Sequence, residues 1–333
     1  MRRRVAWAMV AIAGMVGVSC GGSSTTLVLY NGQHPQLTTA LIAAFQKQTG
    51  ITVSVRTNDG IVLAEQLLQE GRASPADLYL TENSPELTLL QERGLLAKLP
   101  ESILSQIPAQ DSAGDGEWVG VAARVSALAY NTSEISVNQM PASLLDLEQP
   151  QWKGKLAIAP SDSDFVPLVS AMIAEYGVQT TQTWLAGLKA NATIYQDIES
   201  VVAAVNQGAQ SVGIINSYYW FRLQLEVGAS AIHSQIYYFP AGDVGGLENI
   251  SGIALLANSR NPAAAEKFIA FVVSQQGQEL IASGDDFEYP LRPGVSPNPV
   301  LPPLTQIHPD AVSLVSLGND LQAAQLIQQA GLL

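Results

Sequence analysis

Apolar and polar residues follow two periods along the chain, one typical of buried strands and one typical of amphipathic helices. The first apolar run, Thr26–Tyr30, predicts a strand, and Leu37–Gln48 predicts a helix that ends at Gly50. Two further strand and helix pairs follow, at 51–56 and 61–70 and then at 77–80 and 85–93. Strands that alternate with helices predict a parallel, doubly wound α/β sheet.

A second α/β pattern begins near Arg124. Six prolines lie between Pro290 and Pro303, so this stretch cannot continue a helix or an inner strand. We expect one lobe to comprise residues 25–124 and 249–300, and the other to comprise 125–248 and 301–333. The predicted strands are 126–130, 155–159, 212–216 and 250–256, and the predicted helices are 165–176, 181–188, 200–207, 262–274 and 314–329.

Polar side chains gather directly after four of the predicted strands. Ligands of open parallel sheets bind beyond the carboxyl ends of the strands, so these loops are the candidate site. The set is rich in oxygen donors and has one imidazole, which favours a hard cation. Its members are Asn31, Gly32, Gln33, His34, Thr81, Glu82, Asn83, Ser161, Asp162, Ser163, Asp164, Tyr218 and Tyr219.

The adjacent Tyr218 and Tyr219 narrow the identity of the cation. A phenol has a pKa of about 10, so it ligates only a metal that is acidic enough to displace its proton. Fe(III) is such a metal, and paired tyrosines suit Zn(II) or Ca(II) poorly. Tyrosines in tandem can instead be core aromatics, and a single histidine such as His34 can be an ordinary loop residue.

The N-terminus has the pattern of an export signal. Arg2–Arg4 begin it, and the apolar run that follows is too short to span a bilayer as a stable helix. Cys20, the only cysteine, resembles a lipobox cysteine, although Gly17 stands where an aliphatic residue is usual. We expect residues 1–19 to be a signal peptide and 20–25 to be a tether lipidated at Cys20, on an exported, cell-surface or periplasmic protein. The alternative is an ordinary signal with an incidental cysteine.

Charge and motifs exclude several classes of protein. The formal net charge of −13 argues against a nucleic-acid partner, which requires a basic surface. The chain has no H-E-x-x-H, G-x-S-x-G or Walker A motif, so it does not read as an enzyme.

Five stretches resemble the bacterial periplasmic ferric-ion-binding proteins, which are transferrin-like solute-binding proteins of iron ABC transporters. The resemblance implies the type II periplasmic-binding-protein fold, with two doubly wound lobes joined by hinge strands. It implies Fe(III) as the ligand, bound by His34, Glu82, Tyr218 and Tyr219, and a permease and an ATPase as partners. The stretches are Tyr30-Asn31-Gly32-Gln33-His34, Ser74-Pro75-Ala76-Asp77, Trp184-Leu185-Ala186-Gly187-Leu188-Lys189, Ile215-Asn216-Ser217-Tyr218-Tyr219-Trp220 and Glu288-Tyr289-Pro290-Leu291.

One turn departs from that family. Asp162-Ser163-Asp164 stands where the family has a Ser-Gly-Ala-like turn that binds a phosphate, and Ile198 stands where a further asparagine is common. Two carboxylates would repel a phosphate, so the exogenous anion is left open, and the aspartates could simply cap the helix that follows. The candidates for holding an anion or supporting the ligands are Gln33, Asn83, Ser161, Asp162, Ser163, Asp164 and Asn216.

Two other functions remain open from the sequence. Some relatives of this fold bind phosphorylated or other anionic organic solutes, but the acidic turn and the scarcity of arginine in the candidate site argue against such a ligand. A surface adhesin or structural lipoprotein would not need donors that converge on a cleft.

Overall fold

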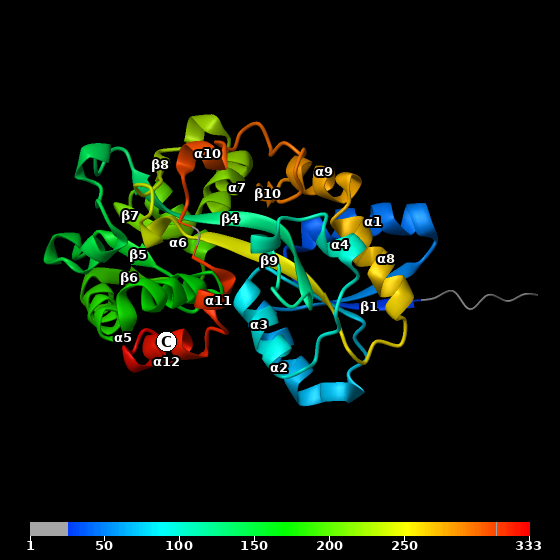
Figure 1. Cartoon of the computed structure of the whole chain (residues 1–333). Coiled ribbons are helices and arrows are strands. Elements are labelled where there is room, and N and C mark those ends of the chain that lie inside the picture. Colours follow the sequence, from blue (N-terminus) through cyan, green and yellow to red (C-terminus); the bar gives the residue numbers. More distant parts are fainter. Residues whose placement is uncertain (1–25, 311) are drawn as a thin grey trace, which may run out of the picture.

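The computed structural model describes residues 26–310 and 312–333. The predicted signal peptide, Cys20 and the tether lie outside the described residues. Two α/β lobes lie side by side and are joined by the long strands β4 (Trp118–Asn131) and β9 (Glu248–Leu255) (Figure 1). No helix within the described part of the chain is both long enough and apolar enough to cross a membrane.

The first lobe is built on the predicted parallel strands. β1 (Thr26–Gly32) pairs in parallel with β2 (Thr52–Thr57) and β3 (Leu78–Thr81), and β9 pairs antiparallel with β3. The predicted helix ends are confirmed, because Gly50 is left-handed (φ 71°) and the Asp59 side chain accepts a hydrogen bond from Ile61 N–H. The helices of this lobe are α1 (Pro35–Thr49), α2 (Gly60–Glu70), α3 (Ser84–Glu92), α4 (Glu101–Leu104), α8 (Pro262–Val272) and α9 (Gln275–Ser283).

The second lobe has its own parallel core. β5 (Leu156–Ile158) pairs in parallel with β6 (Ala192–Ile194) and β7 (Val212–Asn216), while β8 (Ser234–Tyr237) pairs antiparallel with β4. The helices predicted at 165–176 and 181–188 form one long element with a break at Gly177 (φ 76°). The helices of this lobe are α5 (Phe165–Asn191), α6 (Ile198–Asn206) and α7 (Ser217–Val227), and α12 (Leu321–Gln329) packs on α5.

Strand β4 belongs to both lobes. It pairs with β9 as far as Val125 and with β7 from Ser126, so one path of strands, β2-β1-β3-β9-β4-β7-β5-β6, runs through the molecule. The strand predicted at 126–130 is therefore only the second half of a 14-residue buried strand. The sequence pattern did not predict the first half, because the register is irregular between Gly120 and Ala122 and Arg124 is charged. The predicted lobe limit at 124 lies beside this change of partner, and the limits themselves stay a prediction.

The single helix predicted at 314–329 is wrong. The segment forms α11 (Leu314–Leu317) and α12, which are separated by Gly318 (φ 66°) and Asp320 (φ 62°). Asp320 accepts a hydrogen bond from Ser170 of α5, and this tertiary contact accompanies the break. The proline-rich stretch is irregular as predicted, apart from the short β10 (Tyr289–Pro290) and α10 (Leu304–Ile307).

Two glycines bring the start of α2 against the end of β1. A Cβ on Gly32 would lie 2.6 Å from Gly60 Cα, and a Cβ on Gly60 would clash with Glu86 Oε2. A side chain at position 32 would push β1 and α2 apart, and one at position 60 would push α2 away from α3. The close approach places the loop before α2 beside Gln33 and His34, where the lobes face each other.

Candidate functional site

The loops after the strands of both lobes meet around a cavity of about 330 Å³. Carboxylates are common in its lining, and Tyr219 forms part of the wall. The lining includes Gln33, His34, Asp59 and Glu82 from the first lobe and Ser161, Asp162, Ser163, Asp197, Glu199 and Tyr219 from the second. The predicted edge of the sheet is therefore the edge at which the cavity lies.

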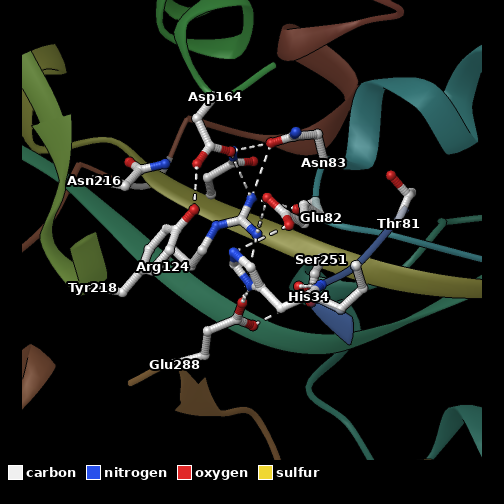
Figure 2. Close-up of polar contacts among 12 residues, drawn as sticks. His34, Thr81, Glu82, Asn83, Arg124, Asp164, Asn216, Tyr218, Ser251 and Glu288 are labelled. Atoms are coloured by element: carbon white, nitrogen blue, oxygen red, sulfur yellow. Dashed lines mark hydrogen bonds and ion pairs between the residues drawn. The ribbon is translucent and has the colours of Figure 1, made fainter. Parts of the chain in front are cut away.

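His34 follows β1 and lies between two carboxylates (Figure 2). Its Nε2 is 3.3 Å from Glu82 Oε1, and its Nδ1 is 3.2 Å from Glu288 Oε1. Gln33 supports this geometry, since its Oε1 accepts from His34 N–H and its Nε2 donates to Glu288. Burial would lower the pKa of His34, but Glu82 and Glu288 outweigh burial and raise that pKa to about 9.

Glu82 follows β3 and faces His34 from the neighbouring loop. Its side chain is 14% exposed, and its Oε2 is 3.4 Å from Nη1 of Arg124. Burial raises the pKa of Glu82 to about 7, although His34 and Arg124 act against that rise. Glu82 and His34 therefore present polar atoms to the cavity from the first lobe.

Tyr218 and Tyr219 occupy the first turn of α7, directly after the buried strand β7. Their ring centroids are 4.0 Å apart, and the His34 ring meets Tyr218 edge-on at 4.9 Å. The Tyr218 hydroxyl donates to Asp164 Oδ2 at 3.1 Å. Burial, and after it the charge of Asp164, raise the pKa of both phenols well above the usual value of 10. Both phenols thus keep their protons unless a strong Lewis acid displaces them.

Arg124, which the sequence analysis did not place in the site, lies at the centre of the carboxylates (Figure 2). Its guanidinium is buried, donates to Asn83 Oδ1 at 3.0 Å, and pairs with Asp164 at 3.1 Å and with Glu288 at 3.7 Å. A charged residue is rarely buried without a partner. A lone arginine inside an apolar run was the available signal, but the sequence does not show which carboxylates it meets.

Glu288 is the second residue that sequence reasoning missed as part of the site. It belongs to the Glu-Tyr-Pro-Leu stretch, is fully buried, and contacts both Gln33 and His34. Its partners lie about 250 residues earlier in the chain, as the sequence separations of 255 and 254 show. A carboxylate on the far nitrogen of an imidazole orients that ring, and such support is common around metal ligands.

The two aspartates of the Asp162-Ser163-Asp164 turn make different contacts. The Asp164 side chain accepts no hydrogen bond from the N–H groups at the start of α5, so the alternative that it caps this helix is wrong. Its carboxylate is drawn instead to Arg124 and Tyr218. Asp162 accepts from the N–H groups of Asp164 and Ile198 at 3.0 Å each. Burial, and then the nearby Asp164, raise the pKa of Asp162 to about 8.

The remaining candidates lie at the margins of the cluster. Asn83 accepts from Arg124, and Asn216 accepts from Ser126 at 3.0 Å. Ser161 is exposed and donates to the carbonyl of Gln196, while Ser163 lines the cavity. Within 26–310 and 312–333, no group of three or more His, Cys, Asp or Glu side chains is arranged to hold a metal ion.

The chain is similar to known proteins over most of its length. Residues 73–306 match the family model described as bacterial extracellular solute-binding protein. The chain is 38% identical to the Fe(3+)-binding periplasmic protein of Serratia marcescens, over 95% of this chain and 94% of that one. It is 32% identical to the major ferric iron-binding protein of Neisseria meningitidis serogroup B, over 92% of this chain and 93% of that one.

Solved structures that resemble this chain include ferric-ion-binding proteins. Iron-bound HitA from Pseudomonas aeruginosa superposes with a TM-score of 0.89 at 38% identity, covering 92% of this chain and 99% of that chain. The predicted α/β fold of the type II periplasmic binding proteins and the resemblance to ferric-ion-binding proteins are confirmed, and the relatives are transport proteins rather than enzymes. This chain belongs to the bacterial extracellular solute-binding protein family.

Proposed function

We propose that this protein captures ferric iron in the cavity between its lobes and delivers it to the permease and ATPase of an ABC importer. The observation that carries the proposal is the meeting of His34 and Glu82 with Tyr218 and Tyr219 at one place. These are the four residues that the sequence resemblance implies as iron ligands. The relatives named for ferric iron add support, since they match nearly the whole chain.

The charges around the four residues suit a trivalent cation. Three carboxylates, those of Glu82, Asp164 and Glu288, surround one arginine and one histidine. A cation that binds here gains attraction from buried negative charge and can ionise the phenols of Tyr218 and Tyr219. Fe(III) is a hard, strongly acidic ion, so it matches oxygen donors whose protons are difficult to remove.

The placement of the donors couples capture to lobe closure. His34 and Glu82 follow strands of the first lobe, while Tyr218 and Tyr219 follow β7 of the second. A cation that all four residues hold binds the closed arrangement better than an open one, so it shifts the population towards closure. β4 and β9 are the segments about which the lobes would move, because they connect the two lobes.

The alternative ligand, a phosphorylated or other anionic organic solute, fits the cavity poorly. The lining carries Asp59, Glu82, Asp162, Asp197 and Glu199, and its described residues include no lysine or arginine. The buried Arg124 is already paired with carboxylates. An anion would lie among these acidic side chains, and no lysine or arginine of the lining could bind it.

Metal analysis and a visible spectrum of protein purified without chelators test the proposal. We expect close to one iron per chain and a broad visible band, because phenolate bound to Fe(III) is coloured. The same protein stripped of metal and loaded with Zn(II) is the control and should be colourless. Protein that takes up no iron and stays colourless when Fe(III) is supplied would contradict the proposed function.

The proposed anchor is Cys20, the only cysteine of the chain. We expect the wild-type protein to fractionate with membranes, and a Cys20→Ser variant to become soluble or to remain uncleaved, since lipid attachment requires the thiol. Membrane fractionation and the mass of the mature N-terminal peptide measure both. A mature N-terminus that lies elsewhere and carries no lipid would show that Cys20 is incidental.

A further inference from the structure

Asp162 bridges the starts of two helices at the wall of the cavity. Its Oδ1 accepts from Asp164 N–H, just before α5, and its Oδ2 accepts from Ile198 N–H, the first residue of α6. Both distances are 3.0 Å. Free N–H groups at helix starts attract anions, because they are unpaired within the helix and lie at its positive end. Here the carboxylate of Asp162 accepts a hydrogen bond from each of these two N–H groups.

The bridge lies on the same cavity as three of the four proposed ligands. Asp162 lines it together with His34, Glu82 and Tyr219. A free oxyanion that entered beside the metal would find the N–H groups of Asp164 and Ile198 already bonded. The carboxyl group of Asp162 also occupies the position at which such an oxyanion would have to bind.

We propose that Asp162 is the built-in counter-anion of the site, so that iron capture needs no phosphate or other added oxyanion. This role rests on the proposed function, since it assumes that Fe(III) is the cargo. A trivalent ion in the cavity favours the ionised carboxylate, which the two helix starts hold in place before the metal arrives. The chain thereby supplies the charge that would otherwise have to come from solution.

The neighbouring aspartates cannot take this part, because their hydrogen bonds are directed elsewhere. Asp164 is bound to Arg124 and Tyr218. Asp197 also lines the cavity, but its Oδ1 caps α6 through Ser200 N–H at 2.8 Å. Asp59 caps α2 in the opposite lobe. Asp197 therefore provides a matched control, since it is a carboxylate at the same helix and cavity that does not bridge the two helix starts.

Iron titration with and without inorganic phosphate tests the role. Metal-free protein is titrated with Fe(III) nitrilotriacetate in phosphate-free buffer, and affinity and the visible band are followed. Wild type should bind equally well in both buffers. Asp162→Ala empties the bridge, so its iron affinity should fall without phosphate and recover roughly tenfold or more with it, a coupling of ordinary size. Asp197→Ala should gain no phosphate dependence.

Asp162→Asn provides a second variant that keeps the side-chain volume but removes the charge. Its iron affinity should fall and phosphate should not restore it, because the amide still fills the position. A phosphate requirement in wild type would overturn the role of Asp162, as would an Asp162→Asn protein with unchanged affinity or an Asp162→Ala protein that gains no phosphate dependence. Wild type that binds no iron in either buffer would overturn the proposed function itself, and with it this role.

Discussion

Replacing Tyr219 by phenylalanine removes most of the visible absorption of the iron-loaded protein and weakens iron binding by more than about 100-fold. We expect more than about 100-fold because loss of a residue that only supports a metal ligand already lowers metal affinity by about 10–100-fold. The ring of Tyr219 packs 4.0 Å from Tyr218, and phenylalanine keeps this contact. The variant therefore loses an anionic oxygen donor without leaving a cavity. Spectrophotometric titration against a competing chelator measures both effects.

A second tandem pair of tyrosines, Tyr237 and Tyr238, supplies the control. Tyr237 lies on β8, and its hydroxyl donates to the carbonyl of Pro141 at 2.8 Å, away from the site. Tyr237→Phe should leave the colour and the iron affinity unchanged. Unchanged colour and affinity in Tyr219→Phe as well would mean that the Tyr218–Tyr219 pair is structural.

Arg124→Met should lower the free energy of unfolding of the iron-free protein by about 3–5 kcal/mol, the usual cost of removing one partner of a buried ion pair. Arg124 is fully buried among Glu82, Asp164 and Glu288, and methionine fills much of the same volume. The substitution leaves these carboxylates together without their cation. Urea unfolding near pH 7 measures the difference.

The control for this variant is Arg222→Met. Arg222 pairs with Glu199 at 3.8 Å, and their side chains are 19% and 55% exposed. Because water screens such a pair, its loss should cost about 1 kcal/mol or less. An Arg124→Met protein that is destabilised no more than this control would show that the buried carboxylates do not need the guanidinium.

The sequence alone determined the elements whose signals are local. Short apolar runs predict β1 and β7, and cap residues such as Gly50 and Asp59 mark the helix ends, because both signals act over a few neighbouring residues. A local signal also identified Tyr218 and Tyr219 as candidate site residues, since they directly follow a buried strand. The carboxyl ends of parallel strands then predict that such loops share one edge.

Only the tertiary structure decided which charges meet. Arg124 lies 42 residues from the Glu82 carbonyl to which it donates, and Glu288 lies 254 residues from His34. The turn at Asp162 and Asp164 looked like a single cap, yet one carboxylate joins two helix starts while the other holds Arg124 and Tyr218. The break between α11 and α12 likewise accompanies a contact of Asp320 with a helix 150 residues away. Buried charges take partners wherever the fold brings compensating groups, and no local period of the sequence records that choice.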